Sequence, residues 1–143
     1  MNRIRNIACC LIFLLTPLGA YADNHAQAQD GHSATLVYEL RTYTSHPGKL
    51  GALEDRFRNH TMALFEKHGI MNVSYWKPLN LPDTLIYLVA HKSELDAATA
   101  WQAFGSDPQW QAVYAESIAE GRLVQNIERV FMTTTDYSPQ RHQ

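Results

Sequence analysis

The stretch Val37–Tyr43, V-Y-E-L-R-T-Y, decides the fold of this chain. Apolar and polar residues alternate along it, and its aromatic and β-branched residues are typical of a β-strand. Successive side chains of a strand point to opposite faces, so Glu39, Arg41 and Tyr43 share one face. The other face is mostly apolar and suits packing under helices. If the face with the carboxylate, the guanidinium and the phenol lines a cavity, that cavity is a candidate site.

The first 22 residues have the features of a signal peptide. Arg3 and Arg5 precede a short apolar run over residues 7–15, and Ala20-Tyr21-Ala22 is a small-x-small cleavage site. The apolar run is too short to span a bilayer as a helix. We expect cleavage after Ala22, a periplasmic or secreted protein, and no membrane attachment afterwards. The alternative is an uncleaved N-terminal anchor.

Composition narrows the choice of partners. Both cysteines, Cys9 and Cys10, lie in the leader, so a chain that starts at Asp23 has no disulfide and no thiol nucleophile. The leader also carries two of the 12 basic residues, which leaves ten basic residues against 14 acidic ones. A net charge of about −4 argues against nucleic acid and anionic membrane surfaces as partners.

The chain has room for one domain. Residues 23–35 lack apolar periodicity and are interpreted as a flexible arm, in which His25 and His32 form too weak a set for a metal site. Residues 36–138 form the domain, and residues 139–143 are a polar tail. The 121 residues that follow the leader (143 minus 22) are enough for one hydrophobic core.

A helix is expected over residues 50–68, with Gly69 ending it. His60 falls in the gap of its apolar stripe between Phe57 and Leu64, so the pattern predicts that His60 points toward the sheet. A buried, neutral His60 suits a base or a hydrogen-bond acceptor. The alternative is a core histidine that binds one backbone carbonyl.

The remaining segments complete the topology. Strands are expected over residues 72–77, 84–91 and 123–135, and a helix starts at Ser93 and is broken at Ser106-Asp107-Pro108. The order predicts a ferredoxin-like βαββαβ sandwich, an α+β fold with a four-stranded antiparallel sheet and helices on one face. The first and last strands are then neighbours.

The uncovered sheet face predicts a dimer. This face is expected to carry Trp76, Tyr87 and Tyr43, which is too apolar for a monomer surface. Pairing two such faces across a two-fold axis gives a homodimer with a barrel-like cavity between the sheets. Within that cavity we expect Arg41 to meet Glu128, or Glu39 to meet Arg129. The alternative is an ordinary cross-strand ion pair on a wet face.

Several short runs resemble the NIPSNAP family. They are V-Y-E-L-R-T-Y, P-G-K at 47–49, R-F-R-N-H at 56–60, F-E-K-H-G at 65–69, W-Q-A-F and D-P-Q-W within 101–110, and T-D-Y-S-P at 135–139. The resemblance implies a dimeric α+β barrel, but it brings no settled reaction. The broader barrel class includes cofactor-independent monooxygenases, haem-degrading oxygenases and small isomerases.

Two functions are compatible with these residues. The first is binding or transformation of a small hydrophobic or aromatic molecule, by cofactor-independent oxygenase-like or isomerase-like chemistry. The predicted catalytic residues are His60 and Glu39, and the predicted substrate-binding residues are Arg41, Tyr43, Trp76 and Tyr87. No cofactor or metal site is expected, and a haem would need His60 or His91 as its axial ligand. The second function is that of a non-enzymatic interaction or scaffold dimer with a filled barrel.

Overall fold

The computed structural model describes residues 36–139. The predicted signal peptide, its cleavage site, the predicted arm and nearly all of the predicted tail lie outside the described residues. Within residues 36–139, no helix is both long and apolar enough to cross a membrane.

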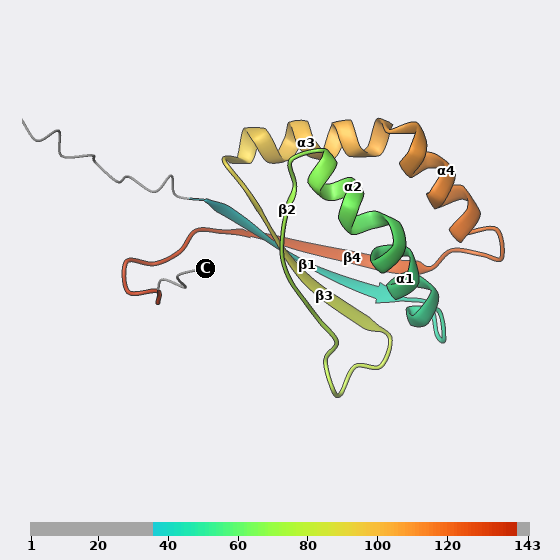
Figure 1. Cartoon of the computed structure of the whole chain (residues 1–143). Helices are drawn as coiled ribbons and strands as arrows, with labels where there is room; N and C mark the ends of the chain where they lie inside the picture. The colour runs from blue at the N-terminus through green and yellow to red at the C-terminus, as the bar shows by residue number, and fades with distance from the viewer. Residues whose placement is uncertain (1–35, 140–143) are drawn as a thin grey trace, which may run out of the picture. The chain divides into compact units, whose positions relative to one another are not determined.

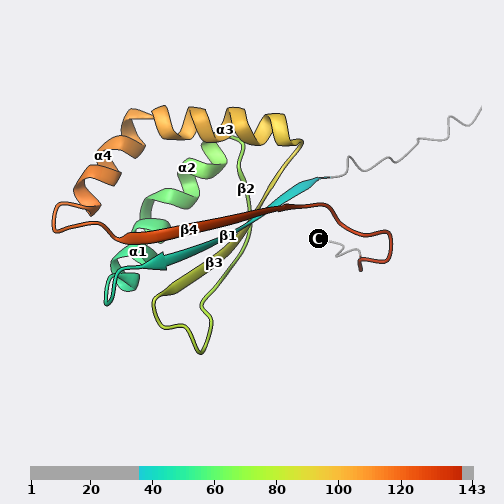
Figure 2. The same cartoon turned by 180° about the vertical axis from the view of Figure 1, so that it is seen from behind.

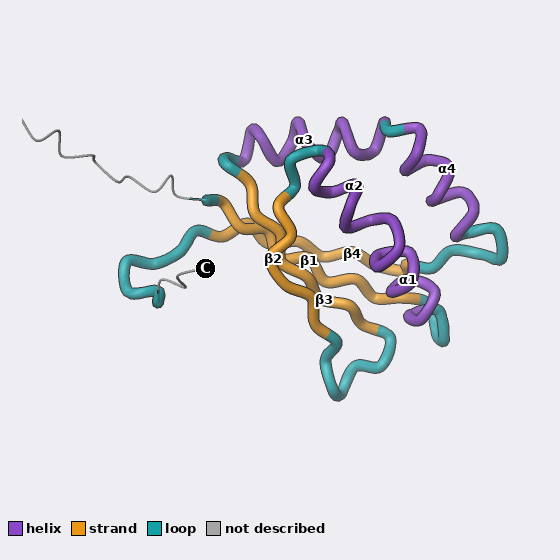
Figure 3. The backbone as a smooth tube through the Cα atoms, in the orientation of Figure 1, coloured by secondary structure: helices purple, strands orange, loops and turns teal. Residues whose placement is uncertain are grey.

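The described chain alternates strands and helices in the expected order. Its elements are β1 (Val37–Ser45), α1 (Leu50–Arg56), the π-helix η1 (Phe57–Thr61), α2 (Met62–Lys67), β2 (Met71–Trp76), β3 (Thr84–His91), α3 (Glu94–Ser106), α4 (Pro108–Ser117) and β4 (Val124–Met132). Figure 3 shows α1, η1 and α2 as one continuous helical run. The predicted break between α3 and α4 is also present.

The four strands form one antiparallel sheet in the order β2-β3-β1-β4. The first and last strands are therefore neighbours, as predicted. Both helical segments lie on the same side of the sheet, which Figures 1 and 2 show from opposite directions. This arrangement confirms the ferredoxin-like α+β fold.

Local sequence signals explain where the helices begin and end. The Ser93 hydroxyl accepts a hydrogen bond from the Asp96 amide at 3.0 Å and caps α3. Asp107 caps α4 through the Gln109 amide at 2.8 Å, with Pro108 at the first helical position. Gly69 follows α2 with a φ of 77°, which costs glycine no strain.

The hydrophobic core lies between the helices and the sheet. It is built largely from aromatic rings: Phe57 and Phe65 on the first helical run, Phe104 on α3, and Tyr87 on β3. Tyr87 is fully buried, and its ring lies 5.1 Å from that of Phe57 between centroids. This layer holds the helices against the sheet and positions the pocket described below.

The opposite side of the sheet, which we call the open face, has no helix over it in the described chain (Figures 1 and 2). The register places Leu40 beside Leu88 of β3 and Val130 of β4 on this face. Trp76 shares the face at the edge strand β2 and remains 47% exposed. The predicted apolar open face is thus present, but only Trp76 of its three predicted aromatic residues lies there.

Candidate ligand-binding site

The polar row of β1 lies beneath the helices, so the expected assignment of the two strand faces was wrong. Glu39 is fully buried there, and both its carboxylate oxygens accept hydrogen bonds. Oε1 accepts from Arg41 Nη1 at 2.9 Å, and Oε2 accepts from Trp101 Nε1 at 2.6 Å. His91 Nε2 lies 3.1 Å from Oε2. We call these four residues the Glu39 cluster.

The Glu39 cluster explains why the polar face turned inward. Burial by itself raises the pKa of Glu39, but the hydrogen bonds from His91 and Trp101 and the charge of Arg41 together bring the pKa below its ordinary value. The carboxylate is therefore ionised and acts only as an acceptor, so His91 Nε2 donates to it. The cluster satisfies charges that would otherwise make burial unfavourable.

The predicted pairing of β1 charges with β4 was also wrong. The register places Arg129 opposite Arg41 and Glu128 opposite Thr42. Within the described residues, neither Glu128 nor Arg129 forms an ion pair with β1. Arg41 instead pairs with Glu39, two residues away on its own strand, because both side chains project to the same face.

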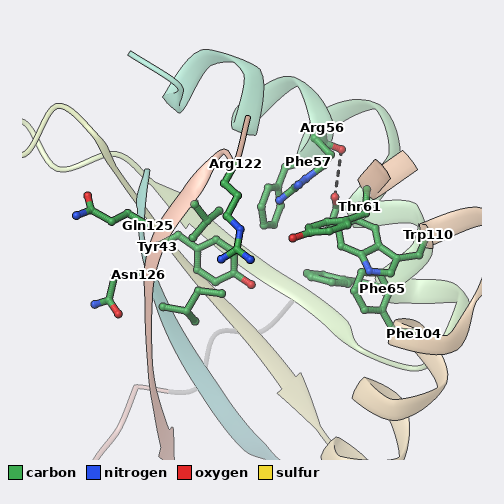
Figure 4. A pocket seen from close by; sticks show the side chains of 13 residues that line it. Tyr43, Arg56, Phe57, Thr61, Phe65, Phe104, Trp110, Arg122, Gln125 and Asn126 are labelled. Carbon is green, nitrogen blue, oxygen red and sulfur yellow. Dashed lines mark hydrogen bonds between the residues drawn. The ribbon is translucent and has the colours of Figure 1, made fainter. Parts of the chain in front are cut away.

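A pocket of about 410 Å³ opens beside Tyr43, between the helices and the start of β4 (Figure 4). This volume lies within the range of small-molecule binding sites. The pocket has aromatic walls made by Tyr43, Phe57, Phe65, Phe104, Trp110 and Tyr114. Thr61 and residues 124–127 complete the lining, and no carboxylate or histidine belongs to it. The pocket can therefore hold an aromatic ligand but offers no conventional general base.

Two arginines extend into this pocket, Arg56 from the end of α1 and Arg122 from the loop before β4 (Figure 4). Arg56 is only 6% exposed, and its Nη1 donates to the Ser117 hydroxyl at 3.0 Å. Its guanidinium carbon lies 5.2 Å from the Trp110 ring centroid and 5.5 Å from that of Tyr114. Burial lowers the pKa of Arg56, although an arginine remains charged at neutral pH.

The structure separates the predicted site residues into different environments. Tyr43 lines the pocket, and Tyr87 lies behind it in the core, where burial raises its pKa. Glu39 and Arg41 belong to the Glu39 cluster, outside the pocket lining. Trp76 lies on the open face. The structure therefore brings Tyr43 and Tyr87 together, with ring centroids 5.2 Å apart, but does not bring Trp76 to them.

The predicted burial of His60 was wrong. His60 is exposed and lines a shallow groove on the outer surface of the helices. The cause is the π-helix Phe57–Thr61: a π-turn contains one residue more than an α-turn, so the inward position moves from 60 to 61. Thr61 is buried instead, and its hydroxyl donates to the Arg56 carbonyl at 3.2 Å.

The pocket residues Arg56, Trp110, Tyr114 and Arg122 were not predicted as a site. For Arg56, the available signal was its position three residues after Leu53, on the buried stripe of the helix. A charged residue at such a position indicates either a buried partner or a ligand.

No group of three or more metal-ligating side chains is present within residues 36–139. Neither His60 nor His91 lines the pocket, and His91 is directed at Glu39.

Fold and pocket together define a ferredoxin-like α+β protein with a ligand-sized pocket between its helices and its sheet. Residues 38–139 match the NIPSNAP family, and the chain belongs to that family. A search of curated proteins found no match.

Solved structures resemble this fold over most of their length. A NIPSNAP family protein of unknown function from Agrobacterium tumefaciens is 22% identical, with a TM-score of 0.65, covering 76% of this chain and 96% of its own. An uncharacterised NIPSNAP-like domain protein from Burkholderia xenovorans is 16% identical, also with a TM-score of 0.65, covering 75% and 91%. A Nitrosomonas europaea protein provisionally assigned as an antibiotic biosynthesis monooxygenase is 13% identical, with a TM-score of 0.54, covering 74% and 96%. At these identities the similarity establishes the fold alone.

Proposed function

We propose that this NIPSNAP protein binds a small aromatic molecule in the pocket beside Tyr43. The observation that carries the proposal is a cavity of about 410 Å³ with walls of aromatic side chains. Aromatic ligands pack edge-to-face or offset against such rings, which adds to the free energy from burial of apolar surface. The proposed binding site lies between the helices and the sheet of one chain, rather than between two sheets.

Binding is favoured over catalysis by the chemistry of the lining. A general base must lie within hydrogen-bond distance of the proton that it removes. The pocket lining contains hydroxyl groups of Tyr43, Thr61 and Tyr114, but no carboxylate, histidine or cysteine. The predicted proton acceptors, Glu39 and His60, lie in the closed cluster and on the outer surface. The proposal therefore assigns no reaction to the pocket.

The proposal retains the predicted homodimer and the periplasmic or secreted location. The homodimer is supported by the apolar open face, where Trp76 and Val130 are 47% and 54% exposed. Replacing Leu88 by Glu puts a charge at the middle of this face and should turn a dimer into a monomer in size-exclusion chromatography with light scattering. A wild-type monomer at all concentrations would contradict the dimer without affecting the pocket.

The proposed periplasmic or secreted location is supported by the leader sequence.

The three tryptophans provide separate reporters for the binding test. Trp110 lines the pocket, Trp101 belongs to the Glu39 cluster, and Trp76 lies on the open face. We would titrate ¹⁵N-labelled protein with 1-naphthylacetamide, a neutral aromatic probe, and follow the three indole N–H signals. The Trp110 signal should shift with saturation, and the Trp76 signal should not.

A matched pair of variants tests the location. Val124→Phe fills the pocket from β4, whereas Val130→Phe makes the same change on the open face of the same strand. Val124→Phe should weaken binding of 1-naphthylacetamide at least tenfold, and Val130→Phe should leave it unchanged. Saturating shifts that are confined to Trp76, or the absence of any shift, would contradict the proposed function.

A further inference from the structure

We propose that the pocket selects aromatic ligands that carry a carboxylate, and that Arg56 is the residue that binds the carboxylate. This inference rests on the proposed function and names the class of ligand. Its starting point is a buried cation inside an aromatic pocket.

Arg56 has few partners for a buried arginine. A guanidinium has five N–H donors. In the described chain its one hydrogen bond is to Ser117, and its Nε is buried without a partner. No carboxylate of the described residues lies within 4.0 Å of it. Contacts with the Trp110 and Tyr114 rings offset part of the cost of removing the charge from water. Donors therefore remain for an oxyanion.

The nearby acidic residues do not supply this oxyanion. Asp55 pairs with Arg58 at 2.6 Å on the exposed side of the helix. Glu116 lines the outer groove, which Arg56 also borders, and forms no ion pair within the described chain. Glu39 is occupied by Arg41. The pocket itself is lined by two guanidiniums and no carboxylate, so its electrostatic potential favours a negative ligand.

Arg122 adds a second positive group to the pocket. It precedes Leu123, which is buried, and follows Gly121, whose φ of 108° permits the turn into β4. Arg122 is itself exposed and has no ion pair within residues 36–139. An exposed arginine attracts an approaching anion, and a buried arginine holds it more strongly, because water competes less inside the pocket.

The lining favours a carboxylate over a phosphate. Phosphate sites usually depend on several backbone amides from a glycine-rich turn or a helix N-terminus. The nearest helix N-terminus, that of α4, is already capped by Asp107. The buried Arg56 instead offers a planar, forked donor whose geometry matches a planar carboxylate.

The test compares three probes that share one ring system. They are 1-naphthylacetate, its neutral isostere 1-naphthylacetamide, and 1-naphthyl phosphate. Dissociation constants are obtained from the Trp110 indole signal of the wild-type full chain at fixed ionic strength. We expect the acetate to bind at least about tenfold more tightly than the amide, since a hydrogen bond to a charged group inside a pocket is worth that factor or more.

Two glutamine variants assign the preference to one residue. Arg56→Gln and Arg58→Gln remove the same charge two positions apart, one inside the pocket and one on the outer surface. Arg56→Gln should reduce the acetate-to-amide ratio to within about twofold of unity. Arg58→Gln should keep the wild-type ratio. Should Arg56→Gln not fold, Arg56→Lys, which keeps the charge but loses the fork, should give a lower ratio than the wild type.

The outcomes separate this inference from the proposed function. If the amide and the acetate shift Trp110 with equal affinity, the pocket binds aromatic molecules and the carboxylate preference is overturned. If the phosphate binds more tightly than the acetate, the assignment to carboxylates is overturned. If neither the amide nor the acetate moves Trp110, the proposed function fails as well.

Discussion

Two arginine–tryptophan pairs lie under the helices of this protein, and they differ in one respect. Arg41 stacks on Trp101, with its guanidinium carbon 4.2 Å from the ring centroid, and pairs with Glu39. Arg56 lies 5.2 Å from the Trp110 ring centroid and has no carboxylate partner within the described chain. The first pair belongs to the closed Glu39 cluster, and the second lies against an open pocket.

The comparison shows how a small domain separates stability from binding. In the Glu39 cluster, the protein supplies both charges and a donor to each carboxylate oxygen, although Arg41 Nε and His91 Nδ1 are buried without a partner. In the pocket, the protein supplies the cation and the aromatic walls but no anion. A buried charge without a partner costs stability, and such sites persist where they serve a function.

The largest expected loss of stability follows from removing the Glu39 carboxylate. Glu39→Ala leaves Arg41 buried without a counter-charge and leaves His91 and Trp101 without an acceptor. We expect a loss of about 3–5 kcal/mol in the free energy of unfolding, because a buried ion pair is broken by removing one partner. Urea denaturation followed by far-UV circular dichroism measures it.

The control for Glu39→Ala is Glu120→Ala, which removes an exposed carboxylate from the turn after α4. Its effect should remain within about 0.5 kcal/mol. A Glu39→Ala variant that unfolds at the same urea concentration as the control would mean that the cluster does not contribute to stability.

The two arginines should respond differently to the same substitution. Arg41→Met leaves Glu39 buried without its arginine partner and should lower the free energy of unfolding by about 3 kcal/mol. Arg56→Met removes an uncompensated buried charge and should change it by about 1 kcal/mol or less. Chemical denaturation of both variants measures the two losses in the free energy of unfolding. Equal losses would mean that the two arginines contribute to stability in the same way.

The stability that Glu39 provides should depend on pH. Its pKa in the folded protein lies below the ordinary value of 4.5, so its contribution is complete well above pH 4.5 and is lost as the pH falls through the folded-state pKa. The difference in the free energy of unfolding between the wild type and Glu39→Gln should therefore be constant near neutral pH and become smaller in acid. A difference that widens as the pH falls would mean that the carboxyl is protonated in the native state.

The topology could be predicted from the sequence because it depends on local patterns. The alternation in β1, the capping residues Ser93 and Asp107, and the breaker Pro108 each determine a local structure without knowledge of the partner segments. The face of β1 could not be predicted in this way. Glu39 is buried because Trp101, 62 residues later, supplies a donor in the folded protein, and no local pattern contains that contact.

The candidate site was harder to predict for a similar reason. Tyr43 lines a pocket beneath the helices rather than on the open face where it was expected, and this pocket also needs Arg56, Trp110 and Arg122 from three other segments. The π-helix added a one-residue shift that hydrophobic spacing does not reveal, since both registers fit a stripe with a gap between Phe57 and Leu64. This shift moved His60 outward and Thr61 inward.

The smallest expected effect is at His60. His60 lies on the outer surface, although it is only four residues from Arg56. His60→Ala should change the free energy of unfolding by less than about 0.5 kcal/mol and leave the Trp110 shift with 1-naphthylacetamide unchanged. Thr61→Ala is the matched neighbour: it removes a buried hydroxyl from the pocket lining and should cost about 1 kcal/mol. If His60→Ala weakens binding more than Thr61→Ala, the helix has the α-helical register in solution, and His60 regains its predicted role as a site residue.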